Sequence, residues 1–355
     1  MLTRRQTIKS VAALAALSAL PSVSFGAMAH LYEKSVVIDA LSFGKNWDEV
    51  EFAALEKAGY SGIIESLERE DLQTAINELV KWRERVSEHS DKLLIALSAS
   101  DFQLAKETGR TAVLMNFQDA TMLESDENNV DALHALGMRC FQLTYNYRNL
   151  LGDGCLERTN SGLSEFGVKV VERANQVGVM IDLSHCGPQT TLDGIEFSGK
   201  PVAITHTFCA ALREHPRAKP DAAIRACAEK GGVIGIAALG YFIGPDPGGK
   251  TTIEDYANHI EHAVSVAGHE HVALSTDFPP QGIKVWATRE DWYEPRLKWF
   301  KPSYQVRWPP WIPKLDTPDR FRNVVKVLQG RGWNDHNLEL LLGKNWLRIF
   351  AETIG

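Results

Sequence analysis

The 355-residue sequence lacks most of the patterns that assign a chain to a common functional class. It has no Gly-x-Gly-x-x-Gly turn for dinucleotides and no Cys-x-x-Cys pair for redox or metal chemistry. After the first 29 residues it has no apolar run of about 18 residues, the length that spans a bilayer. It also has no excess of positive charge, since the formal net charge is −7. We therefore expect neither a membrane span nor a nucleic-acid partner.

Cysteine is scarce and its number is odd, which excludes full pairing within the chain. At least one of the five thiols is unpaired, so a disulfide scaffold is not indicated. The chain has ample material for a large core, because 44% of its residues are hydrophobic. A chain of this length fits one large α/β barrel or two ordinary domains.

The first 29 residues have the parts of a secretory signal. A basic start precedes an apolar stretch over residues 11–20, and the small-x-small end Ala-Met-Ala occupies residues 27–29. The adjacent Arg4 and Arg5 in Thr-Arg-Arg-Gln-Thr further resemble a twin-arginine signal, which a folded-protein exporter reads. We interpret residues 1–29 as a signal peptide.

An exported protein then has one mature domain over residues 30–355, and we expect it to work in the periplasm. Loss of the three basic residues of the signal, which contains no acidic ones, lowers the formal net charge from −7 to −10. The mature protein is therefore more acidic than the whole chain, which further disfavours binding to a phosphate backbone.

Short apolar runs alternate with helical patterns along the mature chain, and nine of the runs are typical of buried parallel strands. They cover residues 35–41, 60–66, 93–98, 111–117, 138–145, 178–184, 201–207, 232–239 and 271–278. A helix is predicted from Leu163 to Val177, where apolar residues recur at helical spacing before Gly178. Repeated strand–helix units predict a (β/α)8 TIM barrel with one extra strand or one misassigned helix. An open doubly wound sheet is the alternative, which the missing glycine-rich turn disfavours.

Polar residues stand at the ends of several of these runs, where a barrel carries its chemistry. They are Asp39, Gln118, Asp119, Tyr145, His185, His206 and Asp277. Barrel closure brings such ends onto one rim, so two histidines from successive strands and a later carboxylate come together. This combination is compatible with a metal site and equally with an acid–base pair, and both interpretations stay open.

Several segments resemble, in order, the signature blocks of the membrane (renal-type) dipeptidase family, peptidase family M19. They read GLSEFGVKVVERANQVGVMIDLSHCG, PVAITHTFCAALREHPRAKPD, GGVIGI, VALSTDF and LELLLGKNWLRIF. The resemblance runs from about Ser35 to Phe350, nearly the whole mature chain. It implies a (β/α)8 barrel of the amidohydrolase superfamily with a binuclear zinc centre that hydrolyses dipeptides.

Four residues match the functional positions of that family. The resemblance implies that His185 and His206 bind the second zinc ion. It also implies that Arg217, which stands eleven residues after His206, holds the carboxylate of the substrate. Asp277 matches the active-site aspartate of the family.

Other positions depart from the family pattern. Leu41 and Phe43 stand where a His-x-Asp pair binds the first zinc ion, and neither side chain can coordinate a metal. Gln118 replaces the bridging glutamate, and Tyr145 replaces a histidine that stabilises the tetrahedral intermediate. These departures predict a reduced site with either no zinc ion or one.

In such a site His185 and His206 are the expected metal ligands, and Gln118 and Asp277 are further candidates. The leading hypothesis is a dipeptidase-like hydrolase of a small peptide or amide. Asp277 then acts as general base, if it is not a ligand, and Tyr145 donates a hydrogen bond to the oxyanion. The alternatives are a periplasmic tailoring enzyme that uses Tyr145 and Asp277 as acid and base on an amino-acid-derived metabolite, and a non-catalytic binder of small peptides.

A segment rich in aromatic and basic residues follows the strand that carries Asp277. It covers residues 285–320 and holds five of the nine tryptophans between Trp286 and Trp311. We expect it to lie over the barrel mouth as a lid or as a subunit interface. The resemblance to a family of homodimers makes a homodimer possible.

Overall fold

The structure is a computed structural model that describes residues 25–44, 46–244, 250–285 and 287–355. The predicted signal peptide therefore lies largely outside the described residues. Only its last five residues fall within them, at the start of helix α2 (Phe25–Lys34). Within the described part of the chain, no helix combines the length and the apolar character needed to cross a membrane.

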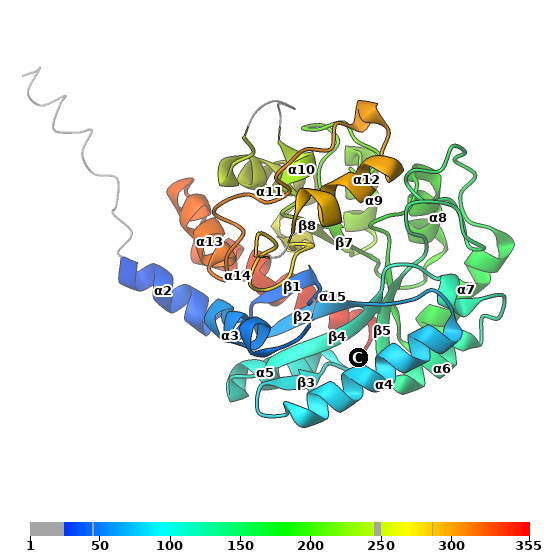
Figure 1. The fold of residues 1–355 in the computed structure, drawn as a ribbon, viewed down its shortest axis with the longest axis horizontal. Helices are drawn as coiled ribbons and strands as arrows, with labels where there is room; N and C mark the ends of the chain where they lie inside the picture. The colour runs from blue at the N-terminus through cyan, green and yellow to red at the C-terminus, as the bar shows by residue number, and fades with distance from the viewer. Residues whose placement is uncertain (1–24, 45, 245–249, 286) are drawn as a thin grey trace, which may run out of the picture.

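A sheet of parallel strands forms the centre of the molecule (Figure 1). Its strands are β1 (Ile38–Ser42), β2 (Gly62–Leu67), β3 (Leu93–Ile95), β4 (Thr111–Phe117), β5 (Met138–Gln142), β6 (Met180–Asp182), β7 (Ala203–Thr207), β8 (Val233–Ile236) and β9 (Val272–Leu274). Eight of them follow the order β1-β2-β4-β5-β6-β7-β8-β9, and β3 pairs with β4 off this path. The predicted (β/α)8 barrel is confirmed, and β3 is the extra strand.

The barrel is nearly closed by contacts between β1 and the chain that follows β9. The backbone N–H of Asp277 donates to the carbonyl of Leu41 at 2.9 Å. Asp39, which the sequence placed on the rim, instead lies in this seam. Its carboxylate accepts hydrogen bonds from the N–H and the hydroxyl of Thr276, at 2.9 and 2.6 Å. Burial raises the pKa of Asp39 to about 7, and the neighbouring Arg320 acts in the opposite direction.

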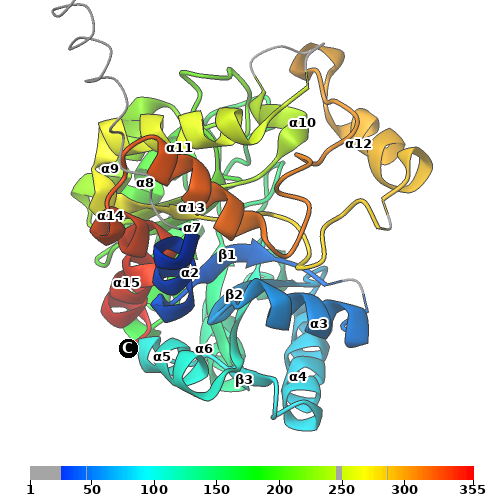
Figure 2. The ribbon, with the colours of Figure 1, turned by 90° about the vertical axis from the view of Figure 1, so that its left-hand side faces the viewer.

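Helices surround the barrel on all sides (Figures 1 and 2). After α2 they are α3 (Glu49–Ala58), α4 (Leu72–Glu88), α5 (Ala99–Thr108), α6 (Asn129–Leu136), α7 (Glu165–Val177), α8 (Pro188–Phe197), α9 (Asp221–Glu229), α10 (Gly240–Ile243), α11 (Ile253–Ala267), α12 (Glu294–Trp299), α13 (Arg320–Gly330), α14 (Asp335–Glu339) and α15 (Asn345–Thr353).

Helix α7 shows how local chemistry sets these bounds. The prediction began the helix at Leu163, but the helix begins at Glu165 because the Ser164 hydroxyl caps it, accepting from the N–H of Gly167 at 3.0 Å. The predicted end is confirmed. Gly178 follows the last helical residue with a φ of 87°, a left-handed conformation that glycine adopts without strain.

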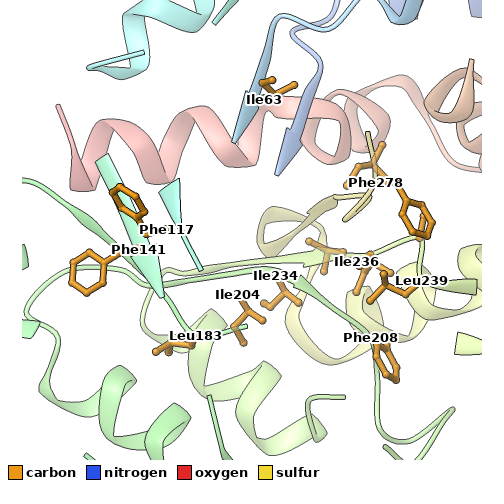
Figure 3. Packing of buried hydrophobic residues seen from close by; sticks show 14 of the residues in the cluster. Ile63, Phe117, Phe141, Leu183, Ile204, Phe208, Ile234, Ile236, Leu239 and Phe278 are labelled. Carbon is orange, nitrogen blue, oxygen red and sulfur yellow. The ribbon is translucent and has the colours of Figure 1, made fainter. Parts of the chain in front are cut away.

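The core has two layers. The larger one lies between the strands and the outer helices, where Phe117, Phe141, Ile204 and Phe208 pack (Figure 3). The smaller layer contains the alternate strand residues, which point into the barrel. Every cysteine is buried as a free thiol: Cys140, Cys155, Cys186, Cys209 and Cys227.

Aromatic side chains close one end of the barrel. Phe350 of α15 stacks on Phe102 of α5, with 4.8 Å between the ring centroids. Trp346 of α15 is also fully buried in this layer, and its indole N–H donates to the carbonyl of Leu274 at 3.3 Å. Figure 2 shows α15 on the side of the molecule opposite α12. The barrel therefore has a closed floor at α15 and a rim toward α12.

Candidate active site

A cavity of about 110 Å³ lies at the carboxyl-terminal rim. Five of the residues selected from the sequence line it together: Gln118, Tyr145, His185, Arg217 and Asp277. His206 is fully buried directly beside His185. The sequence therefore predicted correctly which strand ends meet, as expected for a barrel whose chemistry lies at the carboxyl ends of its strands.

The two histidines face each other through their Nε2 atoms, which are 3.1 Å apart. His185 Nδ1 lies 2.9 Å from Oδ1 of Asn146, which accepts the imidazole N–H. His206 Nδ1 lies 2.8 Å from the hydroxyl oxygen of Thr205. That hydroxyl donates to Asp182 at 2.5 Å and so accepts from the imidazole. These acceptors favour the tautomer with the proton on Nδ1 in both rings, which turns the lone pair of each Nε2 toward the partner.

Asp182 organises this pair from below. Its carboxylate accepts from the N–H and hydroxyl of Ser184 at 3.0 and 2.5 Å and from the N–H and hydroxyl of Thr205 at 2.9 and 2.5 Å. The Ser184 hydroxyl also accepts from the N–H of His206 at 3.0 Å. The ends of β6 and β7, and with them the two imidazoles, are held in register by one buried carboxyl group.

Burial and a neighbouring cation keep the histidines neutral. The pKa of His185 and that of His206 lie well below the usual value because burial disfavours the charged form and Arg217 repels it. Neutral imidazoles are the form that binds a metal ion. Two such nitrogens on a tetrahedral zinc ion stand roughly 3.3 Å apart, close to the spacing of this pair.

The remaining ligands of a metal centre are not assembled. Among the described residues, no group of three or more His, Cys, Asp or Glu side chains is placed to hold a metal ion. Asp277 therefore does not complete a ligand set with the two histidines. The amide nitrogen of Gln118 donates to the hydroxyl of Ser66 at 2.7 Å, which leaves the amide oxygen as the one atom of this side chain that could bind a metal ion. The described residues fit two ligands of one metal ion and do not fit a binuclear centre.

The positions of the lost ligands are apolar, as the sequence indicates. Leu41 is fully buried, and the half-buried Phe43 lines the cavity with its aromatic side chain. The rim beside β1 is therefore a hydrophobic wall where the family pattern has ligands.

Asp277 is the acidic residue of the cavity. Its φ of 59° lies in the left-handed region, an uncommon conformation that is frequent at functional sites. Burial raises the pKa of Asp277 to about 7, while Arg217 and Arg296 act in the opposite direction. A carboxyl group with such a pKa exchanges protons near neutral pH, which suits an acid–base catalyst.

Arg217 is held below the rim by backbone carbonyls. Its Nη1 donates to the carbonyl of Ser184 at 2.6 Å and its Nη2 to that of His206 at 3.0 Å. The side chain is only 2% exposed, yet it lines the cavity. Its guanidinium therefore braces the ends of β6 and β7 and also presents positive charge to the cavity.

Tyr145 forms a stack with its neighbours. Its ring lies parallel to that of His185, with centroids 4.1 Å apart, and the guanidinium of Arg69 lies 4.6 Å from its centroid. The sequence placed Tyr145 at the end of a strand, but β5 ends at Gln142 and Tyr145 follows in the loop. Burial raises the pKa of Tyr145, so its phenol keeps its proton and can donate a hydrogen bond.

The aromatic segment over 285–320 reaches the cavity, as a lid would. Trp292, Arg296, Trp299 and Phe300 from this segment line it. Trp292 is buried, whereas Trp299 keeps 47% of its surface exposed. In Figure 2 helix α12 lies beyond the rim of the barrel, on the side away from α15.

Sequence reasoning singled out neither Asn146 nor Tyr241 as a site residue. Asn146 accepts from the ring of His185, and Tyr241 lines the cavity. The position of Asn146 next to Tyr145 was the only available signal for it, and Tyr241 lies on the short helix α10, which strand patterns do not place at a cavity. Arg296 belongs to the segment expected over the barrel mouth but was assigned no role in binding, and it brings a second guanidinium to the cavity.

The fold and the position of the cavity place the chain among the (β/α)8-barrel proteins that carry their site at the carboxyl-terminal rim. The chain belongs to the membrane dipeptidase family, peptidase family M19, because a model of that family matches residues 50–292. The dipeptidase AC, a metallopeptidase of family M19, has a similar fold at 16% identity, with coverages of 90% and 99% and a TM-score of 0.73.

Individual relatives agree with this assignment. Dipeptidase verJ of Clonostachys rogersoniana is 27% identical over 286 residues, which cover 79% of this chain and 65% of that protein. The crystal structure of an amidohydrolase from Pseudomonas aeruginosa is 30% identical, covers 92% of this chain and 99% of its own, and superposes with a TM-score of 0.81. The probable dipeptidase PvdM from the same organism is 19% identical, with coverages of 92% and 97% and a TM-score of 0.75, a likeness of fold.

Proposed function

We propose that the protein is a dipeptidase-like hydrolase of a small peptide or amide, with at most one metal ion, held by His185 and His206. One observation carries the proposal. In a barrel of the membrane dipeptidase family, a carboxyl group with a pKa of about 7, a protonated phenol and a guanidinium line the same cavity. A general base and a hydrogen-bond donor to the oxyanion both promote amide hydrolysis, and a cation can bind an anionic group of the substrate.

In this proposal Asp277 takes a proton from a water molecule as the water oxygen attacks the amide carbon. The phenol of Tyr145 donates a hydrogen bond to the carbonyl oxygen as negative charge develops there. When the carbon–nitrogen bond breaks, Asp277 returns the proton to the leaving amine. Arg217 supplies positive charge for an anionic group of the substrate. None of these steps passes through a metal ion, because the described residues do not form a three-ligand group.

The same lack of a three-ligand group among the described side chains favours a second candidate. This candidate is acid–base chemistry without hydrolysis on an amino-acid-derived compound, with Asp277 as base and Tyr145 as acid.

In either case the signal-like residues 1–29 support export to the periplasm. The exposed Trp299 and Leu297 on α12 support a second copy of the chain as partner.

Turnover measured together with metal content tests the proposal. We expect protein purified without chelator to carry at most one zinc ion per chain and to release amino acids from at least one member of a panel of dipeptides and N-acyl amino acids. His185→Ala combined with His206→Ala should remove any bound metal, because it removes both Nε2 atoms. His262→Ala, on the outer helix α11, is the matched control. Two metal ions per chain, or no hydrolysis of any panel member, contradicts the proposal.

Restoring the family ligands gives a second prediction. The combined variant Leu41→His, Phe43→Asp, Gln118→Glu should bind two zinc ions and raise dipeptide hydrolysis at least about tenfold, because a second ion and a bridging carboxylate lower the pKa of the attacking water. Phe43→Asp alone is the control, since it adds a carboxylate without completing a ligand set. If the triple variant is folded but gains neither metal nor activity, the pocket has diverged beyond these three positions.

A further inference from the structure

Two guanidiniums at the cavity form no close ion pair among the described residues, although both act on the charge of Asp277. Arg217 and Arg296 both line it, and among the described residues neither forms an ion pair with a carboxylate within 4.0 Å. Arg217 is almost completely buried, where an unpaired charge is costly. Arg69, stacked on Tyr145, adds a third positive charge nearby. A bound anion would pair with this charge.

Arg296 is positioned by the lid segment itself. Its guanidinium carbon lies 3.7 Å from the ring centroid of Trp292, and its Nη1 donates to the carbonyl of Trp292 at 2.6 Å. Among the described residues no acceptor is hydrogen-bonded to its Nε or Nη2, so these N–H groups are available to a ligand. The side chain is half-buried, so the charge is only partly screened by solvent.

The cavity offers almost nothing to a cationic ligand. Among the described residues that line it, Asp277 is the only acid. That carboxyl group is needed as the base. The free amine of an ordinary dipeptide carries a positive charge and would face Arg217 and Arg296 without a dedicated partner. The aromatic rings of Phe43, Trp292 and Phe300 instead suit an uncharged acyl group.

We propose that the ligand of this cavity is an amino acid or small peptide whose nitrogen is acylated and whose carboxylate is bound by Arg296 together with Arg217, so that Arg296 is a specificity-determining residue. This inference rests on the proposed function for the location of the site and deepens it by naming the substrate class.

Four forms of alanylalanine separate the contributions of charge. The N-acetyl acid is an anion, the free dipeptide a zwitterion, the N-acetyl amide neutral and the free-amine amide a cation. Their affinities are measured by isothermal titration calorimetry at pH 7, and chromatography of each sample afterwards shows whether the probe has been cleaved. We expect the N-acetyl acid to bind at least about tenfold more tightly than the other three forms, a difference of ~1.4 kcal/mol.

Substitutions of Arg296 then test its role. Arg296→Gln should weaken binding of the N-acetyl acid at least about tenfold and change the affinity for the neutral form less than about twofold, because only the charge-assisted contact is lost. Arg296→Lys should recover much of the loss. The control is Arg289→Gln on the same segment, because Arg289 stacks on Tyr293, 4.7 Å from its ring centroid, and does not line the cavity.

The outcomes separate this inference from the proposed function. Tight binding of the N-acetyl acid without cleavage upholds the substrate class and contradicts hydrolysis of this peptide. Equal or tighter binding of the free dipeptide overturns the inference even if it is cleaved. Unchanged affinity in Arg296→Gln, or no binding of the N-acetyl acid at millimolar concentration, also overturns it.

Discussion

Asp277→Asn should lower kcat/KM at least about a thousandfold, within the range expected when a general base is removed. The amide cannot accept the proton of the attacking water, while its size and shape keep the cavity intact. In the wild-type protein kcat/KM should rise with pH through about 7 and then level off, because the base is active only after Asp277 has lost its proton. Steady-state kinetics across pH 5–9 measures both effects.

The same substitution should stabilise the protein at alkaline pH. The pKa of Asp277 is about 7 when folded and 3.8 in the unfolded reference, so ionisation favours unfolding. The wild type therefore loses stability as the pH rises from about 4 to 7, up to roughly 4 kcal/mol in total, and Asn escapes this loss. Denaturant unfolding at pH 5 and pH 8 checks the sign. The control is Asp319→Asn, a partly exposed carboxyl group on the outside of the barrel. If Asp277→Asn keeps full activity, Asp277 is not the general base.

Arg217→Ala should reduce both the stability of the fold and the affinity of the cavity for anions. The free energy of unfolding should fall by about 2–4 kcal/mol, because the carbonyls of Ser184 and His206 lose their donors inside the protein. Binding of N-acetyl-alanylalanine should weaken at least about tenfold, because the buried charge is gone. Denaturant unfolding and calorimetry measure the two effects separately.

Arg320 offers a matched control for this prediction. It is also fully buried, and its Nη2 donates to the carbonyls of Pro279 and Pro280 at 2.9 Å each, but it does not line the cavity. Arg320→Ala should therefore destabilise the fold while leaving the affinity for the anion unchanged below the melting temperature. If Arg217→Ala also destabilises the fold without changing the affinity for the anion, Arg217 has only a structural role.

Much of the architecture could be predicted because buried parallel strands leave a direct mark on the sequence. Each of the nine apolar runs overlaps a strand, and polar residues at or just after the end of a run line the cavity, as His185 and Asp277 show. Asp39 was misplaced because it precedes the end of β1 and takes part in closing the barrel. The alternation of side chains along a strand decides whether a residue faces the barrel interior or the outside. Closeness to the end of an apolar run does not decide it.

The arrangement within the site could not be predicted because it depends on loop geometry. Asp277 is the third residue after β9 and has a left-handed backbone conformation, so the strand pattern does not indicate where its carboxyl group points. Arg296 reaches the cavity from a helix about twenty residues further along the chain. Its stacking on Trp292 is a tertiary contact with no counterpart in hydrophobic periodicity.

The closed floor at α15 has a kinetic consequence. Because Phe102, Trp346 and Phe350 fill the far end of the barrel, a molecule in the cavity exchanges with solvent at the rim, where Trp299 and Phe300 line the cavity. Products must leave by the route that admitted the substrate. Contacts with the lid that lengthen the residence time of the substrate therefore also slow the release of product. Tighter binding by the aromatic residues at the rim lowers the turnover rate when product release is the slow step.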